Sequence, residues 1–297
     1  MARKNILHML TPLRQMSPFD VNMALDAGFD AVVPYVGVEA SEITGLVQDA
    51  IFSRPPDAGP STGVFLAGKD ALLALDMLET AKKAMVPPFQ LSVFADPAGS
   101  FTTAAAMVAK VEKALKNHFQ RSLKDTRVAV FGGTGVVGFC TAVIAAREGA
   151  RVTLAGHDGK ERVARIAAGI EQRFKVKVAA ADGSSDAAKR EIVEANDVVL
   201  ACAKAGVQVL SARQLAGSGL LVAADVNAVP PAGVEGLAVN ADATPLDATK
   251  GVGIGALAIG NVKYKVQAGL FRKMIESEKT VTFDFQDAFS LAREIAK

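Results

Sequence analysis

The chain of 297 residues contains no tryptophan, two cysteines and only 6% aromatic residues. With so few aromatic side chains, a surface that stacks nucleic-acid bases is not expected. Cys140 and Cys202 each lie in an apolar stretch, so we expect both to be buried free thiols. Their number and spacing provide neither a disulfide framework nor a zinc site, which fits a reducing cytoplasm.

The sequence also lacks long runs of one charge and long apolar runs. Its 33 Lys and Arg nearly balance 31 Asp and Glu, so we expect no basic patch for nucleic acid or an anionic membrane. Glycine, proline or a charge interrupts the apolar runs, and the first ten residues lack the apolar region of a secretory signal. We therefore expect a cytoplasmic protein with no nucleic-acid or membrane partner.

The first hundred residues alternate between strand and helix patterns. Ser17 and Ser41 are expected to cap two of the helices, with Pro18 in the first turn of one and Gly28 as its stop. This alternation predicts a parallel, doubly wound layer. The expected strands are 5–10, 29–35, 62–68 and 89–97, and the expected helices are 17–28, 41–52 and 69–85.

A long alanine-rich helix, from about Thr102 to Asn117, is expected to lead into a second α/β series. We therefore predict an α/β protein of two domains with a cleft between them. The first is a parallel α/β layer formed by residues 1–104 and completed by helices at about 264–297. The second, residues 105–263, is a Rossmann-type, doubly wound domain that binds a dinucleotide.

A glycine motif opens this second series. The string "VAVFGGTGVVGFC" places G-x-G-x-x-G directly after an expected strand and before an apolar helix, which is the context of a dinucleotide-binding turn. The first glycine is expected to allow the tight turn, the second to admit the pyrophosphate, and the third to let helix and strand pack closely. N–H groups at the helix start would face the phosphates. The candidate cofactor-binding residues here are Gly133, Thr134, Gly135, Val136, Val137 and Gly138.

The end of the next strand bears on the choice between NAD and NADP. Asp158 lies about 20 residues after the glycines, where a carboxylate binds a ribose hydroxyl of NAD. His157 stands in the region where NADP-specific proteins place an arginine for the 2′-phosphate. We therefore expect NAD as cosubstrate with NADP tolerated. A plain surface histidine is the alternative for His157.

The later strands of the series end at the same edge of the sheet, where ligands of open α/β sheets bind. Ala203, Asp225 and Asn227 follow two of these strands and are expected to line the ribose and nicotinamide. A structural role in a turn is the alternative for Asp225.

Two segments are candidates for the substrate side. In "FADPAGSFTTAAA", Asp96, Ser100 and Thr102 offer polar groups at the start of a helix, with helix capping as the alternative for Ser100. The glycine-rich stretch "GVGIGALAIGNVKYK" is expected to let its backbone approach a ligand, and Gly255 is the candidate residue. A valine at this position is then expected to damage turnover more than folding.

Five strings resemble one family over essentially the whole chain: "HMLTPL", "MSPFDVNMA", "FADPAGSFTT", "DVNAVPPAG" and "TKGVGIGALAIGNVKY". They are similar to strings of the bacterial NAD(P)-dependent methylenetetrahydromethanopterin dehydrogenases of methylotrophs. The resemblance implies an active site in the cleft between two domains, and a homo-oligomer, either a trimer or a hexamer. The chain looks closer to the branch that accepts both NAD and NADP, because the strictly NADP-dependent relative has an arginine where His157 stands.

The resemblance also implies a reaction and residue roles. Hydride would pass from methylenetetrahydromethanopterin to NAD or NADP, giving the methenyl product in formaldehyde oxidation. The two nitrogens beside the methylene carbon stabilise the resulting cation and no proton is removed there, so no general base is needed and catalysis is mostly positioning. We also expect no metal. Lys263 matches the family's active-site lysine, and Asp20, in "SPFD", matches a carboxylate on the pterin side. A surface lysine and a residue favoured by the helix dipole are the respective alternatives.

Three other functions fit parts of the pattern. A methylenetetrahydrofolate dehydrogenase has a similar architecture. Comparing the methanopterin and the folate as substrates would distinguish the two functions. A noncatalytic NAD-binding sensor would not need the polar segments described above. A shikimate-type dehydrogenase shares the two-domain plan, but its catalytic lysine–aspartate pair is not evident at the corresponding positions.

Overall fold

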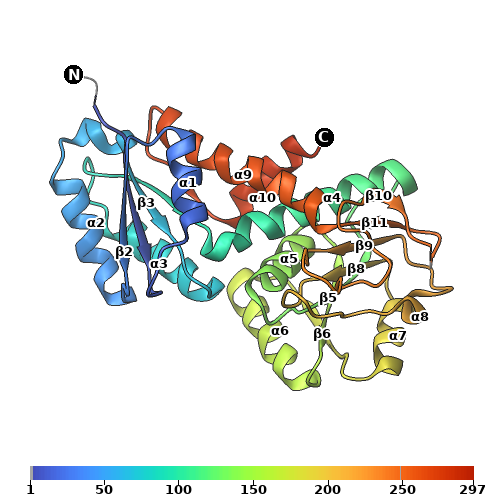
Figure 1. Cartoon of the computed structure of the whole chain (residues 1–297). Helices are drawn as coiled ribbons and strands as arrows, with labels where there is room; N and C mark the ends of the chain where they lie inside the picture. The colour runs from blue at the N-terminus through green and yellow to red at the C-terminus, as the bar shows by residue number, and fades with distance from the viewer. Residues whose placement is uncertain (1–2, 248) are drawn as a thin grey trace. The chain divides into compact units, whose positions relative to one another are not determined.

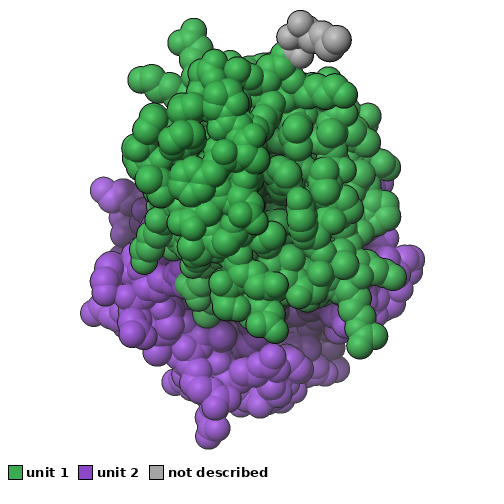
Figure 2. Space-filling model, turned by 90° about the vertical axis from the view of Figure 1, so that its left-hand side faces the viewer, with its two compact units in different colours: residues 1–102, 264–291 green, residues 103–263, 292–297 purple. Residues whose placement is uncertain are grey.

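The computed structural model describes residues 3–247 and 249–297, and the chain divides into two compact units (Figure 1). Unit 1 contains Met1–Thr102 and Tyr264–Leu291, and unit 2 contains Thr103–Lys263 and Ala292–Lys297. Figure 2 colours the two units green and purple. Residues 1 and 2, which we assigned to the first domain, lie outside the described residues.

Unit 1 is built on a five-stranded sheet in the order β12-β4-β3-β1-β2. Every neighbouring pair is parallel, and read from β2 the order is that of flavodoxin-like doubly wound sheets. The parallel layer expected from the strand and helix alternation is therefore confirmed. Its strands are β1 (Ile6–Thr11), β2 (Ala31–Val36), β3 (Thr62–Leu66), β4 (Ser92–Ala95) and β12 (Thr282–Phe283). Its helices include α1 (Pro18–Ala27), α2 (Ile43–Phe52) and α3 (Ala71–Ala84), with short 3₁₀ turns η1 (Ala40–Glu42), η2 (Pro56–Ser61) and η3 (Pro97–Gly99).

The helix ends of unit 1 only partly follow the expected capping. Ser17 has the extended conformation of an N-cap, although its side chain makes no capping hydrogen bond, and Gly28 ends α1 in the left-handed conformation. The cap expected at Ser41 is wrong. Ser41 lies inside η1, where Glu39 is the N-cap and exchanges hydrogen bonds with Glu42 in a capping box. A 3₁₀ turn therefore precedes α2 and occupies the position assigned to its cap.

Phe271 shows why a distant part of the chain completes unit 1. It lies on α9 (Ala256–Glu276) and is fully buried. Its ring centre lies 5.2 Å from those of Phe65 and Phe94, and 6.2 Å from that of Phe29. These aromatic contacts pack the second half of α9 into the core beneath the N-terminal sheet, so segments far apart in sequence share one hydrophobic core.

Unit 2 contains a seven-stranded sheet in the order β10-β11-β9-β8-β5-β6-β7. Read back from β7, the strands follow the 3-2-1-4-5-6 order of the Rossmann fold, with β5 as its first strand and β11 as its sixth. The Rossmann-type prediction is confirmed, but β10 and β11 were not predicted because they are short and irregular, and β10 pairs antiparallel. The strands are β5 (Arg127–Phe131), β6 (Arg151–Gly156), β7 (Val178–Asp182), β8 (Val198–Ala201), β9 (Val222–Asp225), β10 (Asp242–Pro245) and β11 (Val252–Ile254). The remaining helices are α4 (Ser100–Phe119), α5 (Val136–Arg147), α6 (Lys160–Phe174), α7 (Asp186–Glu194), α8 (Ala212–Leu215) and α10 (Phe285–Ile295).

The end of the chain differs from the expected domain division. We assigned all residues after about 264 to the first domain, whereas Ala292–Lys297 group with unit 2. Arg293 explains the difference. Its guanidinium donates to both carboxylate oxygens of Glu112, at 2.6 and 2.7 Å, and to Glu148 at 2.5 Å. Two carboxylates on α4 and at the end of α5 therefore hold this residue of α10 against unit 2.

Two expectations from composition can also be compared with the fold. Cys140 and Cys202 are both buried and free, as expected, and burial raises the pKa of the Cys202 thiol to about 12. Cys202 is therefore an uncharged thiol near neutral pH. In the described part of the chain, no helix combines the length and the apolar character needed to cross a membrane.

Asp197 ties together the starts of two central strands of unit 2, β5 and β8. Its carboxylate accepts from the backbone N–H of Arg127 at 2.9 Å and from the guanidinium of the same residue at 2.8 and 3.1 Å. These hydrogen bonds favour the charged form and lower the pKa of Asp197 to about 2. The stabilisation is complete above the ordinary aspartate pKa of about 3.9 and is lost as the pH falls toward the folded-state value.

Replacing Asp197 by Asn is expected to lower the free energy of unfolding by about 1–2 kcal/mol at pH 7, the lower part of the range for charged hydrogen bonds because Arg127 is half exposed. Urea unfolding of both proteins between pH 7 and pH 3 checks this, and the difference should shrink below about pH 4. Asp125→Asn, which removes an exposed pair with Arg151, is the matched control and should change little. A difference that stays constant with pH would show that the carboxylate charge is not responsible.

Candidate functional site

The glycine turn connects β5 to α5 in unit 2. Gly132, one residue before the motif, has a φ of +81°, which favours glycine strongly. The sharp turn that we assigned to Gly133 is therefore made at Gly132. Gly133 is needed for another reason, since a Cβ there would lie 2.6 Å from the side chain of Leu154 on β6. The assignment of the turn to Gly133 was wrong, because the spacing of glycines in the motif does not reveal which of them has a positive φ.

The other two glycines differ in what surrounds them. A Cβ at Gly138 would press on the carbonyl group of Gly132, so only glycine allows α5 to start this close to the strand end. At Gly135 the nearest atom to a Cβ is the carbonyl oxygen of Gly132 at 3.4 Å, so this position is comparatively open. Gly135 is also the N-cap of α5. A ligand can therefore approach the backbone at Gly135, while Gly138 serves packing within the fold.

The first turn of α5 supplies hydrogen-bond donors. The first intrahelical bond runs from Phe139 N–H to the Gly135 carbonyl, at 2.9 Å. The N–H groups of Val136, Val137 and Gly138 precede it and have no partner within the helix. Together with the positive end of the helix dipole, they suit a phosphate group. Thr134 lies in the same turn, between the strand and the helix.

This turn lies at the point where the strand order of the sheet reverses. β5 has β6 on one side and β8 on the other, and β8 is the fourth strand of the unit. The segment after β8 lies directly against the turn, because a Cβ at Gly132 would come within 2.8 Å of the backbone of Cys202 and Ala203. The structure thus brings Ala203 beside the glycine turn. In doubly wound sheets, such a switch point is where a nucleotide binds.

His157 and Asp158 follow the end of β6, the strand next to β5. The His157 side chain is 77% exposed and lies 3.9 Å from the Asp158 carboxylate. Arg162, one turn along α6, approaches the other oxygen of Asp158 at 3.6 Å. The carboxylate is only loosely engaged and 42% exposed, so it can accept hydrogen bonds from a ligand. The structure therefore leaves the ribose-binding hypothesis for Asp158 open.

The side chains of Asp225 and Asn227 are hydrogen-bonded to the backbone of nearby loops, so they are not free to face a ligand. Asp225 is buried, and its carboxylate accepts from the N–H groups of Asn227, Gly233 and Val234 at 2.6–3.1 Å. Burial raises the pKa of Asp225, and these N–H groups oppose the rise. The amide of Asn227 bonds Gly206 N–H, Val229 N–H and the Pro231 carbonyl. This geometry favours the structural alternative for Asp225 and gives Asn227 a similar loop-positioning role.

Two glycines of the glycine-rich stretch are explained by contacts within unit 2. A Cβ at Gly255 would press on the carbonyl oxygens of Ala238 and Val239, and one at Gly251 would lie 2.5 Å from the Leu220 carbonyl oxygen. The backbone that comes close to these glycines is therefore the protein's own. This overturns the expectation that valine at 255 would damage turnover more than folding, because the larger side chain collides with the neighbouring chain. A ligand contact at Gly255 stays a prediction.

Asp96 and Thr102 form a local hydrogen-bonded group at the start of α4, whose first residue is Ser100. Asp96 accepts from the N–H groups of Phe101 and Thr102, at 2.9 and 3.2 Å, and from the Thr102 hydroxyl at 2.7 Å. Asp96 and Thr102 are fully buried, and Ser100 is 8% exposed. Asp96 therefore caps the first turn of α4, so the capping alternative, which we had weighed for Ser100, applies to Asp96.

Asp20 has a partner that the sequence did not suggest. It lies in the first turn of α1 and is 2% exposed, and its carboxylate accepts from the amide of Gln267 at 2.7 Å. Gln267 is fully buried on α9, 247 positions away in the sequence. A buried carboxylate paired with a buried amide is an uncommon combination of side chains inside a protein, and their hydrogen bond offsets part of the cost of burying them. The only sequence signal was that Gln267 follows Lys263 by four residues on one helix.

Lys263 and Lys265 differ in exposure. Lys263 is partly buried and Lys265 is exposed, which agrees with the choice of Lys263 as the functional lysine of the pair. Both lie on α9, but residues two apart on a helix point in different directions. Among the described residues, no group of three or more His, Cys, Asp or Glu side chains could hold a metal ion.

Solved structures show similar folds at low sequence identity. The NAD-dependent malic enzyme from Thermotoga maritima has a TM-score of 0.59 at 12% identity, covering 97% of this chain and 84% of that one. Quinate dehydrogenase from Corynebacterium glutamicum, in complex with NAD, has a TM-score of 0.56 at 16% identity, covering 97% and 98%. At these identities the likeness shows the fold alone.

Sequence relatives are much more similar. A family described as methylene-tetrahydromethanopterin dehydrogenase, N-terminal, matches residues 18–98. The bifunctional protein MdtA of Methylorubrum extorquens is 35% identical over 285 residues, which cover 94% of this chain and 95% of the relative. The NAD(P)-dependent methylenetetrahydromethanopterin dehydrogenase of the same organism is 57% identical over 297 residues, with complete coverage of both chains. The chain therefore belongs to the family of NAD(P)-dependent methylenetetrahydromethanopterin dehydrogenases.

Proposed function

We propose that this protein transfers a hydride from methylenetetrahydromethanopterin to NAD or NADP and releases the methenyl product. The observation that carries this proposal is the glycine turn at the switch point of unit 2, in a chain 57% identical to a dehydrogenase of that name. Unit 2 then binds the nucleotide, and unit 1 contributes Asp20 to the pterin side. The proposal includes a homo-oligomer, a trimer or a hexamer, located in the cytoplasm.

The residues of the turn fit a dinucleotide. The open position at Gly135 and the first-turn N–H groups of Val136 and Val137 would hold the pyrophosphate, and Asp158 would accept from a ribose hydroxyl. When bound, the nicotinamide supplies the carbon that accepts the hydride. Ala203 offers a small side chain beside the turn, which leaves room for the rest of the cofactor.

On the pterin side, the reaction needs no proton transfer from the protein. The methylene carbon loses hydride without losing a proton, so positioning of the carbon is the main requirement. Lys263 would orient the pterin through a hydrogen bond made away from that carbon, because an ammonium beside a forming cation is unfavourable. Asp20 would accept from the amino-pyrimidine edge of the pterin. Gln267 fixes the rotamer of Asp20 through the 2.7 Å hydrogen bond and so acts as a positioning residue.

The direct test is to follow reduced nicotinamide absorbance with methylenetetrahydromethanopterin and either NAD or NADP. Both nicotinamides are expected to be reduced. Methylenetetrahydrofolate in the same assay is the control substrate and should react much more slowly. Activity with the folate alone would show that the protein is a folate dehydrogenase. No activity with either compound would mean that the protein binds a nucleotide but acts on another substrate.

Lys263→Met is expected to lower kcat/KM for the pterin about 10- to 100-fold, the effect of losing one charge-assisted hydrogen bond. Lys265→Met, on the exposed side of the same helix, is the matched control and should stay within about 2-fold of the wild type. Steady-state kinetics and a thermal unfolding scan of both variants provide the comparison. Equal losses in the two variants would remove Lys263 from the site.

Asp158→Asn is expected to raise the ratio of kcat/KM for NADP to that for NAD by about tenfold. The change removes a negative charge that would repel a 2′-phosphate, and it weakens hydrogen bonds to the ribose of NAD. Asp125→Asn, at the opposite end of the strands in the same unit, should leave the ratio unchanged. An unchanged ratio in Asp158→Asn would mean that this carboxylate does not contact the nucleotide.

A further inference from the structure

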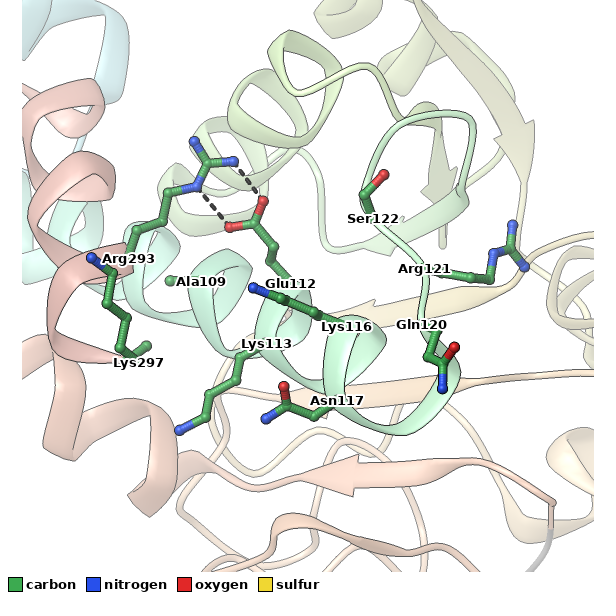
Figure 3. Close-up of a pocket in the computed structure, with 11 residues that line it drawn as sticks. Ala109, Glu112, Lys113, Lys116, Asn117, Gln120, Arg121, Ser122, Arg293 and Lys297 are labelled. Atoms are coloured by element: carbon green, nitrogen blue, oxygen red, sulfur yellow. Dashed lines mark hydrogen bonds and ion pairs between the residues drawn. The ribbon is translucent and has the colours of Figure 1, made fainter.

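An open groove of about 940 Å³ lies in unit 2, away from the glycine turn. It is formed by the C-terminal half of α4, the segment 120–122 and the end of α10 (Figure 3). Segment 120–122 leads into the start of β5, whereas the glycine turn follows the end of that strand. The groove is therefore at the opposite end of the central strand from the proposed nucleotide site.

Positive side chains dominate the residues that line this groove. Five are cationic, and Glu112 is the one acidic side chain among the described lining residues. The charge of Arg293 is already balanced, because it donates to both Glu112 and Glu148. The cationic lining residues are Lys113, Lys116, Arg121, Arg293 and Lys297.

The other cations are poorly balanced. Arg121 lies 3.5 Å from Asp197, but that carboxylate is already bonded more closely by Arg127. Lys113 and Lys116 make no ion pair with any described residue. Figure 3 shows both projecting from α4, with Lys297 on the α10 side of the groove. Like charges around one hollow repel each other, so the groove favours an anion.

Helix stabilisation does not account for both lysines, because Lys116 lies in the last turn of α4, where the helix dipole favours a cation, but Lys113 does not. The end of α4 is closed by its own backbone, since Arg121 N–H bonds the Leu115 carbonyl and Gln120 N–H bonds the Lys116 carbonyl. Gln120 has the left-handed conformation of such a motif, with a φ of +51°. The dipole effect is limited to about the last turn, and Lys113 lies six residues before Phe119, where α4 ends. Lys113 therefore has no role at the helix end.

The hydrogen-bond donors of the groove, lysine ammonium and side-chain amide groups, are regularly spaced along one face of α4. Lys113 and Lys116 are three apart, and Asn117 and Gln120 each lie four residues after one of the lysines, so all four share one side of the helix. Lysine ammonium groups and neutral amides both donate to phosphate oxygens. Spread along about two turns, they match a chain of linked charges better than one compact anion. No aromatic side chain is among the described lining residues, so a stacked base is not required.

We propose that this groove binds an oligophosphate, a ligand with two or three linked phosphate groups, through Lys113, Lys116 and Arg121. The ligand's source can be a free oligophosphate or the phosphate chain of a nucleotide. In either case the phosphate chain is what the groove recognises, and the site is separate from the one that binds NAD or NADP.

Isothermal titration of the full chain with sodium tripolyphosphate tests the proposal. NAD is present at saturation so that the glycine turn is occupied, and the ionic strength is kept constant. Lys113→Gln/Lys116→Gln is expected to weaken binding at least tenfold. The matched control is Lys177→Gln/Lys189→Gln, which removes the same charge from other parts of unit 2 and should change affinity less than twofold. A second titration with ATP should show the same loss in the groove variant.

Several results would overturn the proposal. Equal weakening in the groove and control variants would mean nonspecific attraction to positive charge, and binding of ATP without tripolyphosphate would mean that the phosphate chain is not recognised. Light scattering of the wild type and groove variant checks the mass, and a smaller assembly in the variant would make the groove a contact between copies of the chain. Should the double variant unfold, each single lysine variant is titrated, and undiminished binding in both would also refute the site.

Discussion

The close contact between Gly132 and the backbone after β8 is the constraint on which the nucleotide side depends. The chain leaves β5, turns at a positive φ and enters α5 while touching Cys202 and Ala203. Any Cβ at Gly132 would meet that backbone, and one at Gly138 would meet Gly132 itself. Two glycines thus bring a helix start and a neighbouring strand end to one point, and this places unpaired N–H groups where a phosphate can reach them.

In each unit, buried acidic side chains hold backbone in place. Asp225 binds three N–H groups of the loop after β9, and Asp96 binds the start of α4. Asp20 differs, because its carboxylate accepts from a side chain, the amide of Gln267. Carboxylates that are committed to backbone N–H groups are poor candidates for ligand binding, since a ligand would have to displace those bonds. Among the acids proposed for the site, Asp20 and Asp158 are therefore better placed than Asp96 and Asp225.

The C-terminal segments give both units their final form. Phe271 inserts α9 into the aromatic core of unit 1, and Arg293 attaches the end of α10 to Glu112 and Glu148 of unit 2. The last turn of α10 also completes the basic groove with α4. A chain with a net charge of only +2 thus carries a locally positive hollow, because cations from two segments far apart in the sequence, 113–121 and 293–297, meet there.

The sequence by itself determined the fold class and the Rossmann type of the second series, because strand and helix alternation and the G-x-G-x-x-G context are local patterns. The family followed from the resemblance of five strings along the chain. It also indicated Lys263 over Lys265. Only the tertiary structure decided that Gly132 makes the turn, that Gly255 packs on its own backbone, and that Gln267 bonds Asp20. These features depend on contacts between residues far apart in the chain, and neither spacing nor composition records which backbone atoms will meet once the sheets and helices have packed.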